Sequence, residues 1–338
     1  MKRARKPDIL RAFRTGWWLL AAGTACVAAS DDPPPDDGER VDTAVASVPA
    51  PPPVAELRPK LSPAADTVAQ RLVFAPTIQR AFVAAGRRGR LLVDLGRVDL
   101  DVARPASRLA AFREAVAARS PVPRGTRLRV RGPWGADDVE VAGFDVWNGR
   151  IVATLNAPEH VLSIARQADT LVALAQAADT AAERREGTCI RTTEDTAAAR
   201  VWAVRLDSIR DSVLAVLRET QRPPSPALAA AVTSRSSRAF GCFERGSALL
   251  FVSLHAGDYD WARERTLLVD STGAPRPIEV SDFRFRVHEA LHALDADEDG
   301  VDDVAVRAWT PGGGGTVVLR LVNGRRLERL AAGFAWER

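Results

Sequence analysis

Acidic residues alternate along a short segment near the C-terminal end of the chain. The segment reads Asp295-Ala-Asp297-Glu-Asp299-Gly300-Val-Asp-Asp303, a D-x-D-x-D-G-x-x-D pattern. Carboxylates placed this closely repel one another unless a cation lies among them, and Ca²⁺ takes about six to eight oxygen ligands. Gly300 suits the sharp turn that the sixth position of such a loop requires. The pattern therefore predicts a loop that wraps a hard divalent cation.

The predicted ligands of this Ca²⁺ ion are four side chains and one backbone group. They are the carboxylates of Asp295, Asp297, Asp299 and Asp303 and the carbonyl oxygen of Val301. An EF-hand would have a hydrophobic residue and a glutamate at its eighth and twelfth positions, where this chain has Asp302 and Val306. Residues 304–309 favour a strand, so we expect a strand–loop–strand site. A solvated turn without an ion is the alternative.

A second metal-binding pattern directly precedes the loop, because residues 288–292 spell H-E-x-x-H. On a helix, His288 and His292 would face one Zn²⁺ ion, and Glu289 would activate the bound water as the catalytic base. The alternating residues Phe283–Val287 favour a strand that continues into the motif, and no third zinc ligand follows at a metzincin spacing. We therefore expect a protein that is not an enzyme and keep a zinc-dependent hydrolase as the alternative.

The stretch Leu291–Trp309 resembles the calcium loop of FG-GAP and VCBS-type repeats. It is also similar to single copies of this loop near the end of bacterial lipoproteins. The resemblance covers roughly residues 280–338, and the chain contains one copy where those families have several. It implies a calcium-stabilised extracytoplasmic β module that serves adhesion or surface display rather than a reaction.

The first 30 residues hold the positive charge of the chain. They contain six Lys and Arg residues and one Asp, a balance of +5, whereas the whole chain carries +4. Residues 31–338 therefore carry −1 and contain no long basic run. This balance argues against nucleic acid as a partner.

The same N-terminal residues are typical of an export signal. The apolar run Gly16–Cys26 follows the basic residues and is shorter than the span of about 20 residues that a membrane helix needs. Leu20–Cys26 resembles a bacterial lipobox, except at Gly23, and this implies a lipid on Cys26. Cleavage after Ala29 and retention as a single anchor are the alternatives. We expect an exported protein, lipid-anchored in the periplasm or outer membrane, whose partners are the membrane and another envelope protein or a glycan.

Cysteine and tryptophan residues add two weaker expectations. Cys189 and Cys242 remain as an even pair once Cys26 is set aside, and an oxidising compartment would favour a disulfide between them over two unrelated thiols. A glycan platform could be built from tryptophans, although such side chains more often pack in cores. The candidates are Trp134, Trp147, Trp261, Trp309 and Trp336.

Composition divides the chain into five parts, and the predicted fold class is α+β. The parts are a signal peptide or lipid anchor (1–30), a disordered Pro-rich linker (31–63), a small α+β unit (64–158), a helical segment that could form a hairpin (159–232), and an antiparallel β domain with the calcium loop (233–338).

Hydrophobic periodicity places the elements within these parts. Helices are predicted over 64–86, 107–119, 161–185 and 193–220, the last with an apolar stripe that includes Val201 and Val204. Strands are predicted over 91–102, 127–131, 139–147, 150–155, 248–255, 265–269, 278–288, 303–309, 316–321 and 327–334. The dipeptide Asn148-Gly149 predicts a tight hairpin.

Overall fold

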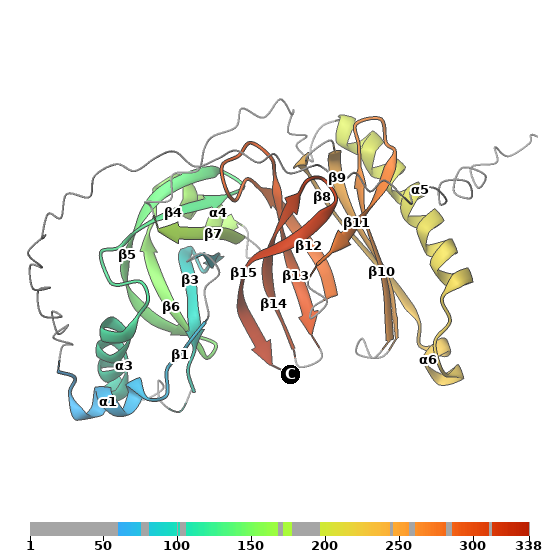
Figure 1. Ribbon diagram of the computed structural model, residues 1–338. Helices are drawn as coiled ribbons and strands as arrows, with labels where there is room; N and C mark the ends of the chain where they lie inside the picture. The colour runs from blue at the N-terminus through green and yellow to red at the C-terminus, as the bar shows by residue number, and fades with distance from the viewer. Residues whose placement is uncertain are drawn as a thin grey trace, which may run out of the picture. The chain divides into compact units, whose positions relative to one another are not determined.

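The computed structural model is rich in β-structure, and its few described helices lie on the outside of the sheets (Figure 1). The described residues are 60–75, 81–99, 101, 106–167, 172–177, 197–243, 246–256, 261–281, 286–310 and 313–337. The fold is α+β with a C-terminal β domain, as the sequence predicts. The predicted signal peptide and nearly all of the Pro-rich linker lie outside the described residues.

The first sheet has seven strands that pair antiparallel in the order β1-β3-β2-β7-β4-β5-β6. These strands are β1 (Val73–Phe74), β2 (Phe82–Arg87), β3 (Arg90–Arg97), β4 (Arg127–Gly132), β5 (Gly135–Trp147), β6 (Arg150–Asn156) and β7 (Val172–Ala177). A further pairing of β3 with β6 closes the sheet on itself. Asn148 (φ 48°) and Gly149 (φ 75°) form the tight turn between β5 and β6, so the predicted hairpin is confirmed.

The first helix is shorter than the sequence predicts. Helix α1 (Pro63–Ala69) begins at Ser62, whose hydroxyl accepts a hydrogen bond from the Ala65 amide at 3.2 Å. The predicted helix over 64–86 is wrong at residues 73–74 and 82–86, which belong to strands β1 and β2. The residues of β2 are nearly all buried, and this environment suits a strand covered on both faces better than an amphipathic helix.

Helix α3 (Ala106–Arg119) confirms the prediction for 107–119. Its apolar side chains Phe112 and Val116 are fully buried against the first sheet, together with Val68 of α1. This helical layer closes one side of the first core.

The helix predicted over 161–185 is confirmed over 161–167 and wrong over 172–177, and its other residues lie outside the described ones. Helix α4 (Glu159–Gln167) occupies its start, and β7 follows, between β2 and β4 of the first sheet. Val172 and Leu174 of β7 are both 1% exposed. A short apolar run fits a buried strand as well as a helix. Here the run forms a strand because β2 and β4 each offer it an edge for hydrogen bonding. The predicted helical hairpin over 159–232 therefore does not form.

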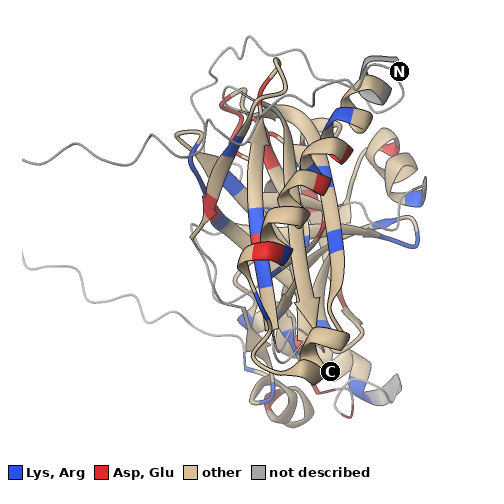
Figure 2. Cartoon of the chain, turned by 90° about the vertical axis from the view of Figure 1, so that its right-hand side faces the viewer, with Lys and Arg blue, Asp and Glu red and all other residues tan. Residues whose placement is uncertain are grey.

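Helix α5 (Ala197–Thr220) confirms the second predicted helix over its described part and is followed by α6 (Pro226–Ala230). Leu214 and Leu217 pack on the outer face of the second sheet, where α5 runs along the strands (Figure 2). Val201 and Val204 are each 71% exposed, so their place in the predicted buried stripe is wrong. Among the described residues, no helix is both long and apolar enough to cross a membrane.

The second sheet has eight strands in the order β12-β13-β14-β15-β11-β10-β9-β8. They are β8 (Thr233–Phe243), β9 (Gly246–Ala256), β10 (Trp261–Val269), β11 (Pro275–Val280), β12 (Arg286–Leu294), β13 (Asp303–Thr310), β14 (Gly313–Val322) and β15 (Arg326–Glu337). All pairs are antiparallel except β11 with β15. The two end strands meet where the Ser237 hydroxyl bonds the backbone of Ala290.

The two sheets belong to the same unit of the chain and share a buried layer. Its members include Val83, Leu92 and Leu174 of the first sheet and Leu294, Val318 and Leu330 of the second. Asp94 of β3 lies in this layer, 3% exposed, where it pairs with Arg150 at 2.9 Å and accepts a hydrogen bond from the Phe334 amide of β15. Ala296 of the acidic segment and Ala305 of β13 belong to the same layer, so this segment and the start of β13 lie close to both sheets.

Candidate metal centre

The acidic segment is the connection between β12 and β13, two adjacent strands of the second sheet. Leu294 and Asp303 are partners in the antiparallel register, so the loop leaves and re-enters the sheet at neighbouring positions. The site is therefore strand–loop–strand, as its departure from the EF-hand pattern predicts.

Three of the predicted ligands converge in this loop. Asp295, Asp297 and Asp299 each offer one carboxylate oxygen, and these oxygens lie within 4.8 Å of one another. The Asp295 carboxylate accepts hydrogen bonds from the amides of Asp299 and Gly300, both at 3.1 Å. Gly300 has φ 83°, a left-handed conformation in which glycine is favoured. The loop thus turns tightly around its first carboxylate and keeps the other two beside it.

Asp303 is the most informative residue of the site, because it is only 3% exposed. Its Oδ1 accepts a hydrogen bond from the Leu321 amide at 3.2 Å, whereas its Oδ2 is buried and has no hydrogen-bond partner among the described residues. Burial, followed by the charge of nearby Asp297, raises the pKa of Asp303 well above its usual value. A buried carboxylate oxygen without a partner is costly. A cation among these carboxylates would satisfy it.

One arginine partly offsets the negative charge of the loop. The Arg320 guanidinium lies 2.8 Å from Asp297 Oδ2. Burial nevertheless raises the pKa of Asp297, as it does that of Asp295. The single positive charge of this guanidinium cannot balance all four carboxylates, and a divalent cation would offset the remaining negative charge.

The remaining predicted ligand, Val301, donates its amide to Asp299 Oδ1 at 2.8 Å. This bond holds the Val301 amide beside the Asp299 carboxylate, and the role of the Val301 carbonyl stays a prediction. Asp302, which is 2% exposed, points elsewhere. Its Oδ2 accepts a hydrogen bond from the Cys242 amide at 2.6 Å, and its own amide donates to the Cys242 carbonyl at 2.7 Å. Asp302 therefore ties the loop to β8, a role that the sequence pattern did not reveal.

Glu298 connects the loop to the first sheet. It has φ 61° and accepts hydrogen bonds from the Nε atoms of Arg129 and Arg131 of β4, both at 2.8 Å. The Arg131 side chain is 2% exposed and also donates to Gln176 of β7 at 2.7 Å. The hydrogen bond from Arg129, ahead of the opposing effect of burial, lowers the pKa of Glu298. Arg129 and Arg131 lie 169 and 167 positions before Glu298 in the chain. No sequence pattern connects residues so far apart, so these contacts were not predicted.

The H-E-x-x-H motif lies on strand β12 and not on a helix. His288 contacts Arg235 of β8 and the ring of Trp309, whereas the Nε2 atom of His292 accepts a hydrogen bond from the Val172 amide at 3.1 Å. Burial lowers the pKa of both histidines to about 4. Glu289 pairs with Arg307 at 2.7 Å. Within the described stretches, neither histidine joins a group of three metal-ligating side chains, so these residues do not fit the zinc site of the alternative hypothesis.

The other candidate residues are dispersed. Cys26 and Cys189 lie outside the described residues, so the lipid anchor and the disulfide with Cys242 stay predictions. The Sγ atom of Cys242 lies 3.6 Å from the Gly300 carbonyl oxygen. Trp134 packs against the first core and Trp261 against the cluster under α5, so these two do not share a platform.

Comparison with known proteins identifies no relative of this chain. No protein-family model, curated protein or solved structure matches the chain significantly. Function therefore has to be argued from the site itself.

Proposed function

We propose that the chain is a non-enzymatic cell-envelope protein whose C-terminal β domain binds one structural Ca²⁺ ion. The ion would lie among Asp295, Asp297, Asp299 and Asp303, with the Val301 carbonyl as a further ligand. The buried and unpartnered Oδ2 atom of Asp303, next to three converging carboxylates, is the observation that carries this proposal.

The donor set favours calcium over other metals. All proposed ligands are oxygen atoms, which suit hard cations, and the histidines that Zn²⁺ would prefer have other partners. Mg²⁺ requires near-octahedral geometry and keeps several of its waters, whereas Ca²⁺ accepts a flexible shell of carboxylates and carbonyls. The tight and partly buried loop therefore fits Ca²⁺ better.

The proposed role of the ion is to stabilise the junction of the two sheets. The loop contacts β8 through Asp302 and β4 through Glu298, and it joins β12 to β13. Without a cation, repulsion among the carboxylates would weaken all of these contacts together. One bound ion would then hold the surface in a single conformation for a partner, such as another envelope protein or a glycan.

An exported location agrees with such a site. Extracellular calcium modules bind with dissociation constants of about 10⁻⁴–10⁻³ M, which match an environment rich in free Ca²⁺. The basic and apolar N-terminal residues support export to the periplasm or outer membrane, with Cys26 as the lipid attachment point.

Thermal unfolding of Asp303→Asn with excess calcium and with EGTA tests the proposal. In EGTA, we expect the variant to melt above the wild type, because the amide removes a buried charge. With calcium, we expect the order to reverse, because only the wild type gains stability from the ion. The exposed Asp99 provides a matched control, Asp99→Asn, which should follow the wild type in both buffers. Equal responses of Asp303→Asn and wild type to calcium would overturn the proposal.

A further inference from the structure

The second sheet contains a hollow that lies apart from the proposed metal centre. It has a volume of about 750 Å³ and is lined by residues of β10, β11 and the start of β12, and by Arg325 in the turn between β14 and β15. Sites for small organic ligands commonly have about 300–1,000 Å³ and a mainly apolar wall with a few polar groups. Here Ile278, Val280 and Val287 supply apolar wall, and several arginines supply charge.

Two polar atoms of this wall are buried without a hydrogen-bond partner among the described residues. Arg276 Nη2 and Glu264 Oε1 are shielded from solvent, and neither forms a hydrogen bond to the described part of the protein. The other Glu264 oxygen lies 3.7 Å from Arg286 Nη1. An unsatisfied buried polar atom lowers the stability of the fold. A ligand that offers acceptor oxygens to Arg276 and Arg286 would remove part of this cost.

We propose that the hollow binds a small organic anion. Its carboxylate or phosphate would lie between Arg276 and Arg286, and its apolar body would lie against Ile278, Val280 and Val287. Guanidinium groups form paired, charge-assisted hydrogen bonds with carboxylates and phosphates, so both headgroups share the required chemistry.

Glu264 would make this binding depend on pH. Burial raises the pKa of Glu264 to about 7 against the opposing effect of Arg286. The protonated carboxyl can donate a hydrogen bond to the anion, whereas the ionised form repels it and competes for Arg286. The other charged or titratable groups that the structure describes around this region are Arg263 and Arg265 of β10, Arg276 and Glu279 of β11, Arg235 of β8, His288 of β12, and Arg325 in the turn before β15. His288, with a pKa of about 4, stays neutral near pH 7.

Isothermal titration calorimetry with hexanoate, hexyl phosphate and hexanol tests the proposal. The full chain is titrated at one fixed calcium concentration, so that failure of the metal proposal does not affect the result. At about pH 6, we expect at least one of the two anions to bind and hexanol to bind at least about tenfold more weakly. The tighter anion identifies the headgroup. Equal binding of hexanol, or no binding of either anion at millimolar concentration, overturns the proposal.

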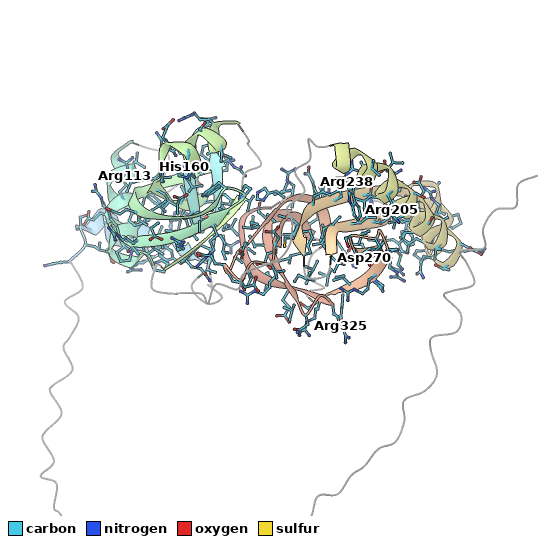
Figure 3. The ribbon with its side chains drawn as sticks, turned by 90° about the horizontal axis from the view of Figure 1, so that it is seen from above. Arg113, His160, Arg205, Arg238, Asp270 and Arg325 are labelled. Carbon is cyan, nitrogen blue, oxygen red and sulfur yellow. The ribbon has the colours of Figure 1, made fainter. Side chains whose placement is uncertain are left out.

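Variants locate the site and test its pH dependence. Arg276→Gln should weaken anion binding about tenfold or more, whereas Arg113→Gln, an equal loss of charge on α3 (Figure 3), should leave it unchanged. Arg286→Gln replaces Arg276→Gln if the latter does not fold. Glu264→Gln should retain binding at about pH 6 and lose the decrease expected between about pH 6 and 8. Equal effects of Arg276→Gln and Arg113→Gln, or an unchanged pH profile in Glu264→Gln, contradict the proposed geometry.

Discussion

Two segments that both resemble metal sites follow one another in this chain, and the fold treats them in opposite ways. The acidic loop gathers the carboxylates of residues 295, 297 and 299 within 4.8 Å of one another. In the H-E-x-x-H segment, the His288 ring contacts Arg235 of β8, and His292 accepts a hydrogen bond from a backbone amide of β7. The loop brings its carboxylate oxygens together, whereas strand β12 keeps its two histidines with different partners.

The difference shows that the spacing of potential ligand residues predicts a metal site only when the backbone conformation brings their side chains together. Residues four apart face one ion when they lie on a helix, because a helical turn has 3.6 residues. On β12 the pairing is interrupted at two places, between Val287 and Glu289 and between Ala290 and His292. Alternate residues of a loop can instead converge because backbone amides hold the chain around its first carboxylate, as they do at Asp295.

The largest expected effect comes from the glutamate of the loop. Glu298→Ala removes the partner of Arg131, whose side chain is 2% exposed, and leaves a buried charge poorly compensated. We expect the free energy of unfolding to fall by about 3 kcal/mol, measured by urea denaturation with saturating calcium. A loss below about 1 kcal/mol would show that the loop does not hold the two sheets together.

Calcium removal comes next. With free calcium at about one hundred times its dissociation constant, the ion contributes about 2.7 kcal/mol, and EGTA should remove this contribution from the wild type. Zinc added to the calcium-free protein should not restore it, because the two histidines of β12 have other partners. Restoration of stability by zinc but not by calcium would mean that the H-E-x-x-H segment, and not the acidic loop, is the metal site.

Acid should destabilise the fold by protonating His292 of strand β12. Burial lowers the pKa of His292 to about 4 in the fold, whereas an exposed histidine has a pKa of about 6.5. A lowered pKa stabilises the fold above pH 6.5, and this contribution is lost as pH falls toward 4. By pH 5, we expect a loss of about 2 kcal/mol. His292→Gln retains an acceptor for the Val172 amide and should reduce this pH-dependent loss, as measured by urea denaturation across the same range. An unchanged pH dependence in the variant would place the titration elsewhere.

The smallest effect is expected for the glutamate of the strand. Glu289 and Arg307 are 44% and 37% exposed, and exposed ion pairs contribute little. Glu289→Ala should change the free energy of unfolding by less than about 1 kcal/mol and leave the response to calcium unchanged. A loss as large as that of Glu298→Ala would remove the distinction between the two segments.

The sequence predicted the parts of the fold in which local signals and burial agree. The Asn148-Gly149 turn, helix α3 and strand β13 after the acidic loop are examples, whereas the single strand predicted over 278–288 is replaced by β11 and β12. It failed at residues 172–177, where a short apolar and Ala-rich run becomes a buried strand because β2 and β4 offer it two edges. Local periodicity cannot show such an edge when its residues lie far away in the sequence.

The candidate site shows the same limit. The positions of the three converging aspartates and of buried Asp303 follow from a local pattern of nine residues. The contacts of Glu298 with Arg129 and Arg131, and of Asp302 with Cys242, join separate parts of the chain. Both residues belong to the acidic run, so composition alone did not distinguish them from the predicted ligands.

Equilibrium dialysis of the purified chain against radioactive calcium tests the central claim most directly. The account predicts one calcium ion per wild-type chain, none in Asp303→Asn at the same free concentration, and unchanged binding in His288→Gln. A wild-type chain that retains no calcium at millimolar concentration, or one that loses metal through His288→Gln rather than Asp303→Asn, would contradict it.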